Sequence, residues 1–260
     1  MADVLVQDVS GRPLSPCTRE RAESLVSEGK ASWIASTPPA IRLLRSVTRR
    51  DPAPPEPHPL VGKRTLLHIC CGPCATYTVQ AFRAAGGILT GYWYNPNIQP
   101  FSEHTARLQA LESLAGQIDL PVIWEPGYDV VAFLRAVSGQ EALGLRCRIC
   151  YRQRLDRTAR AAAEGGFEAF STTLLISPYQ NLEEIRLLGN EAAERWRVPF
   201  YWENLRRGFA EHHRLAKRYG LYRQRYCGCL FSQWEALDRT ATTRGSPDAG
   251  AESDTAAEAC

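Results

Sequence analysis

The sequence predicts an α/β fold in which helices cover both faces of a mostly parallel sheet, and two observations carry this prediction. Along the body of the chain, apolar runs of strand length alternate with longer segments whose apolar residues recur every three or four positions. Two glycine pairs and one Asn-Pro turn separate some of these segments. Alternating strands and helices of this kind build parallel sheets, because each helix brings the chain back to the end of the sheet at which the preceding strand began.

Five short strands are expected in the body of the chain. The first is the apolar run 66–69, which ends directly before the adjacent cysteines Cys70 and Cys71. The remaining strands are expected at 88–94, at 121–124, within 167–176 and at 198–202. Open α/β sheets bind ligands at the carboxyl ends of their strands. The sequence therefore places this cysteine pair where such a fold builds its sites.

Amphipathic helices are expected between these strands. The first, 74–85, ends at a glycine pair, which is a common helix terminator. The second begins at Ser102, and the third covers 148–164. The fourth follows Asn181, whose spacing from Glu184 is typical of a capping box.

Proline and small polar residues mark the boundaries of the expected domains. A proline-rich segment at 51–63 predicts an extended linker between a small N-terminal unit, 1–50, and the main body, 64–238. Residues 239–260 contain almost no large apolar side chains, which predicts a disordered tail. The hydrophobic fraction of 44% is enough for a substantial core in the main body.

Seven of the nine cysteines fall into three tight clusters, at 70–74, 147–150 and 227–229. No apolar run is long enough to cross a membrane, and the first residues lack the pattern of a secretory signal. We therefore expect a cytoplasmic protein with no membrane partner. Thiols stay reduced in the cytoplasm, so clusters of this kind favour metal binding or catalysis over a disulfide framework.

The first two clusters have the spacing of metal ligands. Cys147 and Cys150 lie three apart at the expected start of a helix, so they share one face. Cys70 and Cys71 can face one metal only from a loop, which the turn between strand and helix supplies. Four thiolates suit zinc or an iron–sulfur cluster, and a thioredoxin-like redox pair at 147 and 150 also fits the spacing.

The third cluster, Cys227-Gly228-Cys229, suits redox chemistry. Two residues of extended chain span about 7 Å, so the two Cα atoms can just come within disulfide range. A ring this small is strained, and strained disulfides are readily reduced. Gly228 permits the backbone distortion that such a ring needs. We therefore expect a catalytic dithiol that cycles through a disulfide, with further metal ligation as the alternative.

Five stretches of the sequence, which follow one another between residues 64 and 235, read LHICCGPC, YWYNPNI, RCRICYRQRL, STTLLISPY and GLYRQRYCGCLFS. In sequence and order they resemble the cobalamin-independent epoxyqueuosine reductases of the QueH family. The family often has alanine after the paired cysteines, and we expect Gly72 at this position to change little. The resemblance implies a Rossmann-like (HUP-type) arrangement of the sheet.

This resemblance implies an enzyme that reduces epoxyqueuosine to queuosine at the wobble position of tRNA, the last step of queuosine biosynthesis. It implies a [4Fe-4S] cluster and a redox-active pair, Cys227 and Cys229, with tRNA and an unidentified electron donor as partners. The cluster ligands that it implies are Cys70, Cys71, Cys147 and Cys150. Cys74 stays outside this ligand set, and an additional iron is left open.

The basic residues favour a nucleic acid as the partner. Only three of them are lysines, and arginine offers a planar fork of donors that matches phosphate. Two arginine-rich stretches, 146–160 and 206–225, flank cysteine clusters, and Tyr222 and Tyr226 interleave the second. Candidates for contact with the substrate are Tyr94, Asn95, Asn97, Tyr179 and Asn181.

The N-terminal unit separately resembles the small RRXRR-type domain, on residues 11–17, 22–30 and 41–44. This similarity implies an accessory domain associated with nucleic acid, and a plain structural appendage is the alternative. Two other functions compete for the main body. One is a tRNA-thiolating enzyme of the PP-loop class, whose phosphate-binding turn is replaced here by the proline-containing first cysteine cluster. The other is a zinc-stabilised RNA-binding module.

Overall fold

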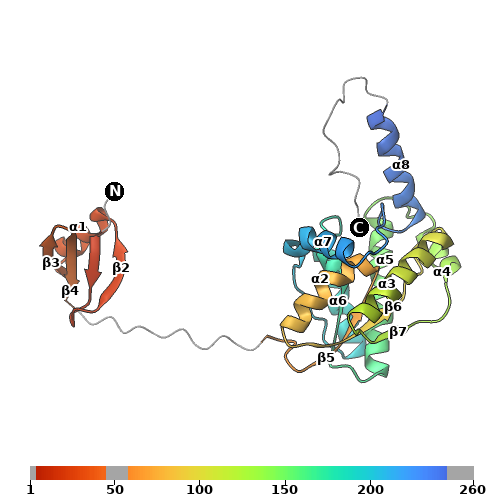
Figure 1. Ribbon diagram of the computed structural model, residues 1–260, viewed down its shortest axis with the longest axis horizontal. Helices are drawn as coiled ribbons and strands as arrows, with labels where there is room; N and C mark the ends of the chain where they lie inside the picture. Colours follow the sequence, from red (N-terminus) through yellow and green to blue (C-terminus); the bar gives the residue numbers. More distant parts are fainter. Residues whose placement is uncertain (1–3, 45–57, 245–260) are drawn as a thin grey trace. The chain divides into compact units, whose positions relative to one another are not determined.

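The computed structural model describes residues 4–44 and 58–244, which form two separate units (Figure 1). The division falls between Glu56 and Pro57. The expected linker therefore lies mostly outside the described residues, as does the part of the expected tail beyond residue 244. Each unit has its own core.

The C-terminal unit is built on a four-stranded sheet that is parallel throughout. Its strands are β5 (Arg64–His68), β6 (Ile88–Trp93), β7 (Val122–Trp124) and β8 (Ala169–Thr172). They lie in the order β7-β6-β5-β8, with β5 paired to both β6 and β8. The chain moves outward from β5 to β7 and then returns to add β8 on the other side. The order of the strands therefore reverses between β5 and β8, and open α/β folds bind ligands at the carboxyl ends of the strands at such a point.

Helices cover both faces of this sheet, as the sequence predicts. One group packs around α2 (Gly72–Ala84) and contains α3 (Phe101–Gln117) and α7 (Phe209–Arg218). The other packs around α5 (Leu145–Glu164), which lies against β5 and β8, and contains α4 (Val130–Val137) and α6 (Leu182–Trp196). Two short 3₁₀ helices, η1 (Thr173–Ile176) and η2 (Arg206–Gly208), and the helix α8 (Leu230–Arg244) complete the unit. Within the described residues, no helix is long and apolar enough to span a membrane.

Several expected elements differ in detail. The fifth strand, at 198–202, is reduced to a single bridge between Phe170 and Phe200. Pro199 lacks an N–H, so it contributes only its carbonyl, which accepts from the amide of Phe170 at 3.0 Å. α8 continues to Arg244, beyond the expected start of the tail at 239.

α5 begins at Leu145, three residues earlier than expected, after Gly144 with φ of +93°. Cys147 therefore lies in the first turn of the helix rather than just before it, and Cys150 lies in the second turn.

Gly72 has a packing role that the sequence does not reveal. It begins α2, where that helix crosses α3 closely. A Cβ atom at this position would lie 2.8 Å from the carbonyl oxygen of Ala110, which is backbone and cannot turn aside. The expectation that this residue changes little is therefore wrong for this chain.

The N-terminal unit is a four-stranded mixed sheet with one helix. The strands β1 (Val4–Gln7), β2 (Pro13–Cys17), β3 (Ala31–Ser36) and β4 (Pro39–Leu43) lie in the order β2-β1-β4-β3. Only β1 and β4 pair in parallel. The helix α1 (Arg19–Ser27) starts at Thr18, whose hydroxyl caps it, and buries Ala22 against Val4, Val6 and Ile41.

Candidate redox and metal site

The turn between β5 and α2 gathers three buried cysteines, Cys70, Cys71 and Cys74. Their sulfur atoms all lie within 4.8 Å of one another, which suits a shared metal ion. Cys71 ends the extended chain and serves as the N-cap of α2, where its sulfur accepts from the amide of Cys74 at 3.4 Å. The amide of Cys70 donates to the hydroxyl of Thr173, the first residue after β8, at 3.1 Å.

The two adjacent thiols of this turn are electrostatically unequal. A hydrogen bond with Cys71, whose sulfur lies 3.8 Å away, and a contact with Thr173 lower the pKa of Cys70 to about 6. Burial raises the pKa of Cys71 well above its ordinary value. The turn therefore favours one thiolate before any metal binds.

The second cluster lies on the first two turns of α5. Cys150 is buried, and its sulfur accepts from Nη2 of Arg154, one turn further along the helix, at 3.0 Å. Burial raises the pKa of Cys150 to about 12. Phe133 and Val137 of α4 pack with Cys150 and with Cys229 of the third cluster in one apolar group. The second and third clusters therefore lie close together, and both contact α4.

The third cluster is held through its backbone. Arg107 of α3 donates to the carbonyl oxygens of Tyr226 and Cys227 at 2.9 and 3.0 Å. The amide of Gln99 donates to the carbonyl of Gly228 at 2.8 Å. Gly228 has φ of +138°, a conformation that suits glycine, so a glycine is needed between the two cysteines.

The side chains of this pair face different partners. The sulfur of Cys227 lies 3.5 Å from the amide nitrogen of Gln180, whose oxygen accepts from the hydroxyl of Tyr151. The sulfur of Cys229 lies 3.5 Å from the hydroxyl of Ser232. Both cysteines carry free thiols in this structure.

One buried guanidinium links all three clusters. The side chain of Arg154 is 2% exposed, and its charge interacts with the sulfur atoms of Cys150, Cys227 and Cys70. Arg107, 1% exposed, interacts with Cys71 and with Cys70 in the same way. The predicted site residues are therefore brought to one region, at the carboxyl ends of β5 and β8.

The charges of this region suit an anionic group. Among the described residues, Glu103 is the one buried carboxylate that contacts Arg107 or Arg154. Its Oε1 lies 2.7 Å from Nε of Arg107. Arg154 contacts sulfur instead of an acidic side chain. A buried cation is costly unless an anion compensates it. Thiolates that hold a metal carry that negative charge, so the donor set and its surroundings fit a metal–thiolate group.

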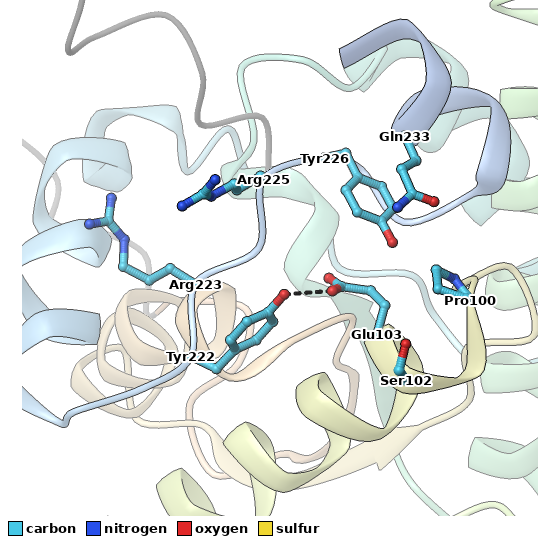
Figure 2. A pocket seen from close by; sticks show the side chains of 8 residues that line it. All are labelled: Pro100, Ser102, Glu103, Tyr222, Arg223, Arg225, Tyr226 and Gln233. Carbon is cyan, nitrogen blue, oxygen red and sulfur yellow. Dashed lines mark hydrogen bonds between the residues drawn. The ribbon is translucent and has the colours of Figure 1, made fainter. Parts of the chain in front are cut away.

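A cavity of about 460 Å³ opens beside the third cluster, and we call it the Glu103 cavity (Figure 2). Figure 2 shows the hydroxyl of Tyr222 directed at the carboxylate of Glu103, 2.5 Å away, with the arginines on one side. The lining residues are Pro100, Ser102, Glu103, Tyr222, Arg223, Arg225, Tyr226 and Gln233. Tyr226, which lines the cavity, directly precedes Cys227 in the sequence.

The candidate substrate contacts are distributed differently. Tyr94 lines a second cavity of about 460 Å³ together with Glu125 and Arg157. Asn95 instead donates to the carbonyl of Ile69 at 2.9 Å and so holds the first cysteine turn, and Asn97 is buried. The remaining two lie at the start of α6, where Tyr179 is exposed and Asn181 caps the helix.

Comparison with known proteins assigns the family. The model of the epoxyqueuosine reductase QueH family matches residues 65–235, which hold all three clusters. The chain belongs to the QueH family.

Its curated relatives are epoxyqueuosine reductases. The protein of Dehalococcoides mccartyi is 38% identical over 179 residues, which cover 69% of this chain and 97% of the relative. The protein of Thermotoga maritima is 38% identical over 183 residues, covering 68% of this chain and 93% of the relative. For the protein of Histophilus somni the identity is 34% over 175 residues, with coverage of 65% and 72%. The RRXRR protein model matches residues 4–57, so the N-terminal unit lies outside the QueH part.

Two features of this QueH site go beyond the sequence prediction. The sequence leaves Cys74 outside the ligand set, with an additional iron left open, and in the structure its sulfur lies close to those of Cys70 and Cys71. The spacing Cys-Cys-Gly-Pro-Cys already brings the third cysteine onto the first turn of the helix. The second feature is the buried arginine pair. Arg154 follows Cys150 by four residues, a helical spacing that signals contact.

Proposed function

We propose that this chain reduces epoxyqueuosine to queuosine at the wobble position of tRNA, the last step of queuosine biosynthesis. The observation that carries the proposal is the meeting of three cysteine clusters around Arg154, inside the part of the chain that matches the QueH family. The reaction breaks both C–O bonds of an epoxide, leaves an alkene and releases the oxygen as water. It consumes two electrons and two protons.

The proposed cofactor is a [4Fe-4S] cluster held by Cys70, Cys71, Cys147 and Cys150. When bound, such a cluster supplies single electrons and a Lewis-acidic iron. The close approach of Cys74 to Cys70 and Cys71 supports it as an alternative ligand or as a ligand of an additional iron. The apolar contacts of Cys150 and the buried cations Arg107 and Arg154 exclude water and offset the negative charge of the thiolates.

The proposed role of Cys227 and Cys229 is to carry the electron pair. Oxidation of this dithiol to a disulfide releases two electrons and two protons, which equals the demand of the deoxygenation. An external electron donor must then reduce the disulfide for the next turnover. The free thiols, the glycine between them and the backbone contacts from Arg107 support this role, because a fixed backbone holds both sulfurs near the first two clusters.

The proposed partner is the anticodon arm of tRNA, and this substrate would place the protein in the cytoplasm. The target nucleotide must leave the stack of the loop to reach buried thiols. Binding then needs contacts to phosphate and aromatic surfaces for unstacked bases. Arg223, Arg225 and the exposed Tyr222 line the Glu103 cavity and are residues of this kind.

Nucleoside analysis of cellular tRNA tests the proposal. Cells that lack an epoxyqueuosine reductase accumulate epoxyqueuosine, and expression of this chain should restore queuosine. The Cys227→Ser variant serves as the matched inactive control. Unchanged epoxyqueuosine, with the full-length protein present in the cells, would contradict the proposed function.

Metal analysis of protein purified without oxygen tests the cofactor separately. A [4Fe-4S] cluster predicts about four iron and four acid-labile sulfide per chain. Zinc without sulfide would instead support a zinc-stabilised RNA-binding module.

A further inference from the structure

We propose that the Glu103 cavity is a subsite for an RNA nucleotide adjacent to the one that is reduced. Its phosphate would contact Arg225, and its base would stack on Tyr222. This inference rests on the proposed action on tRNA and adds where the RNA is held. Three observations carry it: the charge of Arg225, the fixed tyrosine ring, and the link from the cavity to the redox pair.

The first arginine-rich stretch is occupied by contacts within the protein. On α5 and its ends, each arginine of residues 146–160 contacts a carboxylate or a thiol in the described part of the chain. The pairs are Arg146–Glu235, Arg148–Glu184, Arg152–Glu191, Arg154–Cys150, Arg157–Glu125 and Arg160–Glu164. These arginines are therefore poor candidates for phosphate contacts.

The second stretch leaves the positive charge of Arg225 at the cavity. Arg223 and Arg225 both line it and are both exposed. Arg225 has no acidic partner among the described residues, and Nη2 of Arg223 lies 3.1 Å from Nδ1 of His213. Figure 2 shows the two guanidinium groups on the same side of the cavity. Guanidinium groups match phosphate oxygens in geometry and charge.

The inner wall offers a fixed aromatic surface. Tyr222 is 43% exposed, and its hydroxyl is held by Glu103. Glu103 is held in turn by Arg107, whose charge offsets that of the carboxylate and so removes its repulsion of phosphate. A ring that is already fixed loses little entropy when a base stacks on it. The hydroxyl of Ser102 and the amide of Gln233 add polar groups at the rim.

The cavity is joined directly to the proposed redox pair. Tyr226 lines it, Cys227 follows, and Arg107 donates to the carbonyl oxygens of both. A nucleotide held here therefore keeps its neighbour in the RNA strand close to the buried thiols. That placement is what an enzyme needs when it acts on a base extruded from a loop.

Fluorescence anisotropy with a labelled RNA hairpin, copied from the anticodon arm of an unmodified tRNA, tests the subsite. The full-length protein is titrated at several salt concentrations. Arg225→Gln should weaken binding several-fold and lower the slope of log Kd against log salt by about one, the value for one lost phosphate contact. Arg160→Gln removes the same charge from α5 and should match the wild type. Equal slopes for the two variants would overturn the subsite.

Two tyrosine variants test the stacking surface. Tyr222→Ala should weaken binding about tenfold, as expected for one lost base stack, while Tyr222→Phe keeps the ring and should stay within about twofold of the wild type. Equal affinity of the alanine variant and the wild type would overturn the stacking role. Melting curves check that each variant is folded. If the wild type itself fails to bind the hairpin, the proposed action on tRNA fails as well; if it binds and only the cavity variants have no effect, the subsite alone fails.

Discussion

At the scale of single residues, Arg154 is the side chain on which the thiol site depends most. It is buried, it donates to the sulfur of Cys150, and its charge also interacts with Cys70 and Cys227. Its role is to compensate negative charge where three thiol clusters meet. The charge is permanent, because a guanidinium does not lose its proton in proteins.

Loss of the Arg154 charge should weaken metal binding. Arg154→Met should lower metal affinity by about 10–100-fold, the usual effect of removing a group that supports metal ligands. Arg154→Lys keeps the charge and should recover part of the affinity. The measurement is iron release against a chelator titration, with Arg160→Met as the exposed control on the same helix. An Arg154→Met protein that retains iron as the wild type does would show that the thiolates need no compensation.

The cysteines should separate by function when each is replaced. Cys70→Ser should remove iron, because it deletes a thiolate from the buried turn. Cys227→Ser should retain iron and sulfide but abolish turnover with epoxyqueuosine-containing tRNA. Iron and sulfide analysis beside the activity assay distinguishes the two. Loss of iron from Cys227→Ser would reassign that residue as a ligand.

His212 should make the fold sensitive to mild acid. Burial, and secondly the neighbouring His213, lower the pKa of His212 to about 4, whereas an unfolded histidine titrates near 6.5. Below pH 6.5 the unfolded chain binds a proton that the folded chain does not, so stability falls as the pH falls towards 4. Between pH 7 and 5.5 the loss should be about 1 kcal/mol. Urea unfolding of wild type and His212→Gln at both values measures it, and an equal loss in both proteins would contradict this origin.

At the scale of elements, the contact of α2 with α3 sets the position of the first cysteine turn. Gly72 is where the two helices approach most closely among the glycines of α2 and α3, and it follows Cys71 directly. Any side chain at 72 must move α2, and with it the turn that holds the buried thiols. The fold therefore links helix packing to the geometry of the site.

Gly72→Ala should destabilise the protein by about 1–3 kcal/mol, the usual cost of overpacking. Gly116→Ala is the matched control, because Gly116 lies on the exposed end of α3 and its added Cβ would meet nothing within 4 Å. That variant should be neutral or slightly more stable, since alanine favours helices. Urea denaturation midpoints compare the two. A stable Gly72→Ala protein would show that α2 can shift without cost.

Much of the α/β unit could be predicted from the sequence, because strands and helices differ in the spacing of their apolar residues. The run before Cys70, the glycine pair after the first helix and the cap at Asn181 all lie where they were expected. The strand at 198–202 could not be judged in this way. Its composition suits a strand, but pairing depends on the N–H that Pro199 lacks.

The site was predictable in its parts but not in its assembly. Spacing indicates that each cysteine cluster has a chemical role. Their meeting depends on α5 crossing β5 and β8, and on Arg107 reaching from α3 to the carbonyls of Tyr226 and Cys227. The contacts of Arg107 with Tyr226 and Cys227 join residues more than a hundred positions apart in the sequence. Local patterns carry no information about them.

At the scale of the whole molecule, the two units divide the chain into a QueH part and an N-terminal part. All three clusters and both cavities lie in the C-terminal unit. Two residues at the start of that unit belong to it structurally. His58 contacts the hydroxyl of Tyr201 at 2.8 Å, and Leu60 is buried in the core. Catalysis should therefore need only the chain from Pro57 onward.

A protein that begins at Pro57 should reduce an epoxyqueuosine-containing anticodon hairpin with kcat/KM within a few-fold of the full chain. A second truncation that also removes His58 and Leu60 should be less stable, because it deletes core contacts. Steady-state rates and melting curves test both statements. A large loss of activity in the Pro57 protein, with iron content unchanged, would assign the N-terminal unit to catalysis.

The mass of the modified nucleoside tests the central claim most directly. Protein purified without oxygen is incubated with epoxyqueuosine-containing tRNA and a chemical reductant, and the digested nucleosides are examined by mass spectrometry. The account predicts a product lighter by one oxygen atom that coelutes with queuosine, formed by wild type and absent with Cys227→Ser. Unchanged epoxyqueuosine in the presence of iron-loaded, reduced wild type would contradict it.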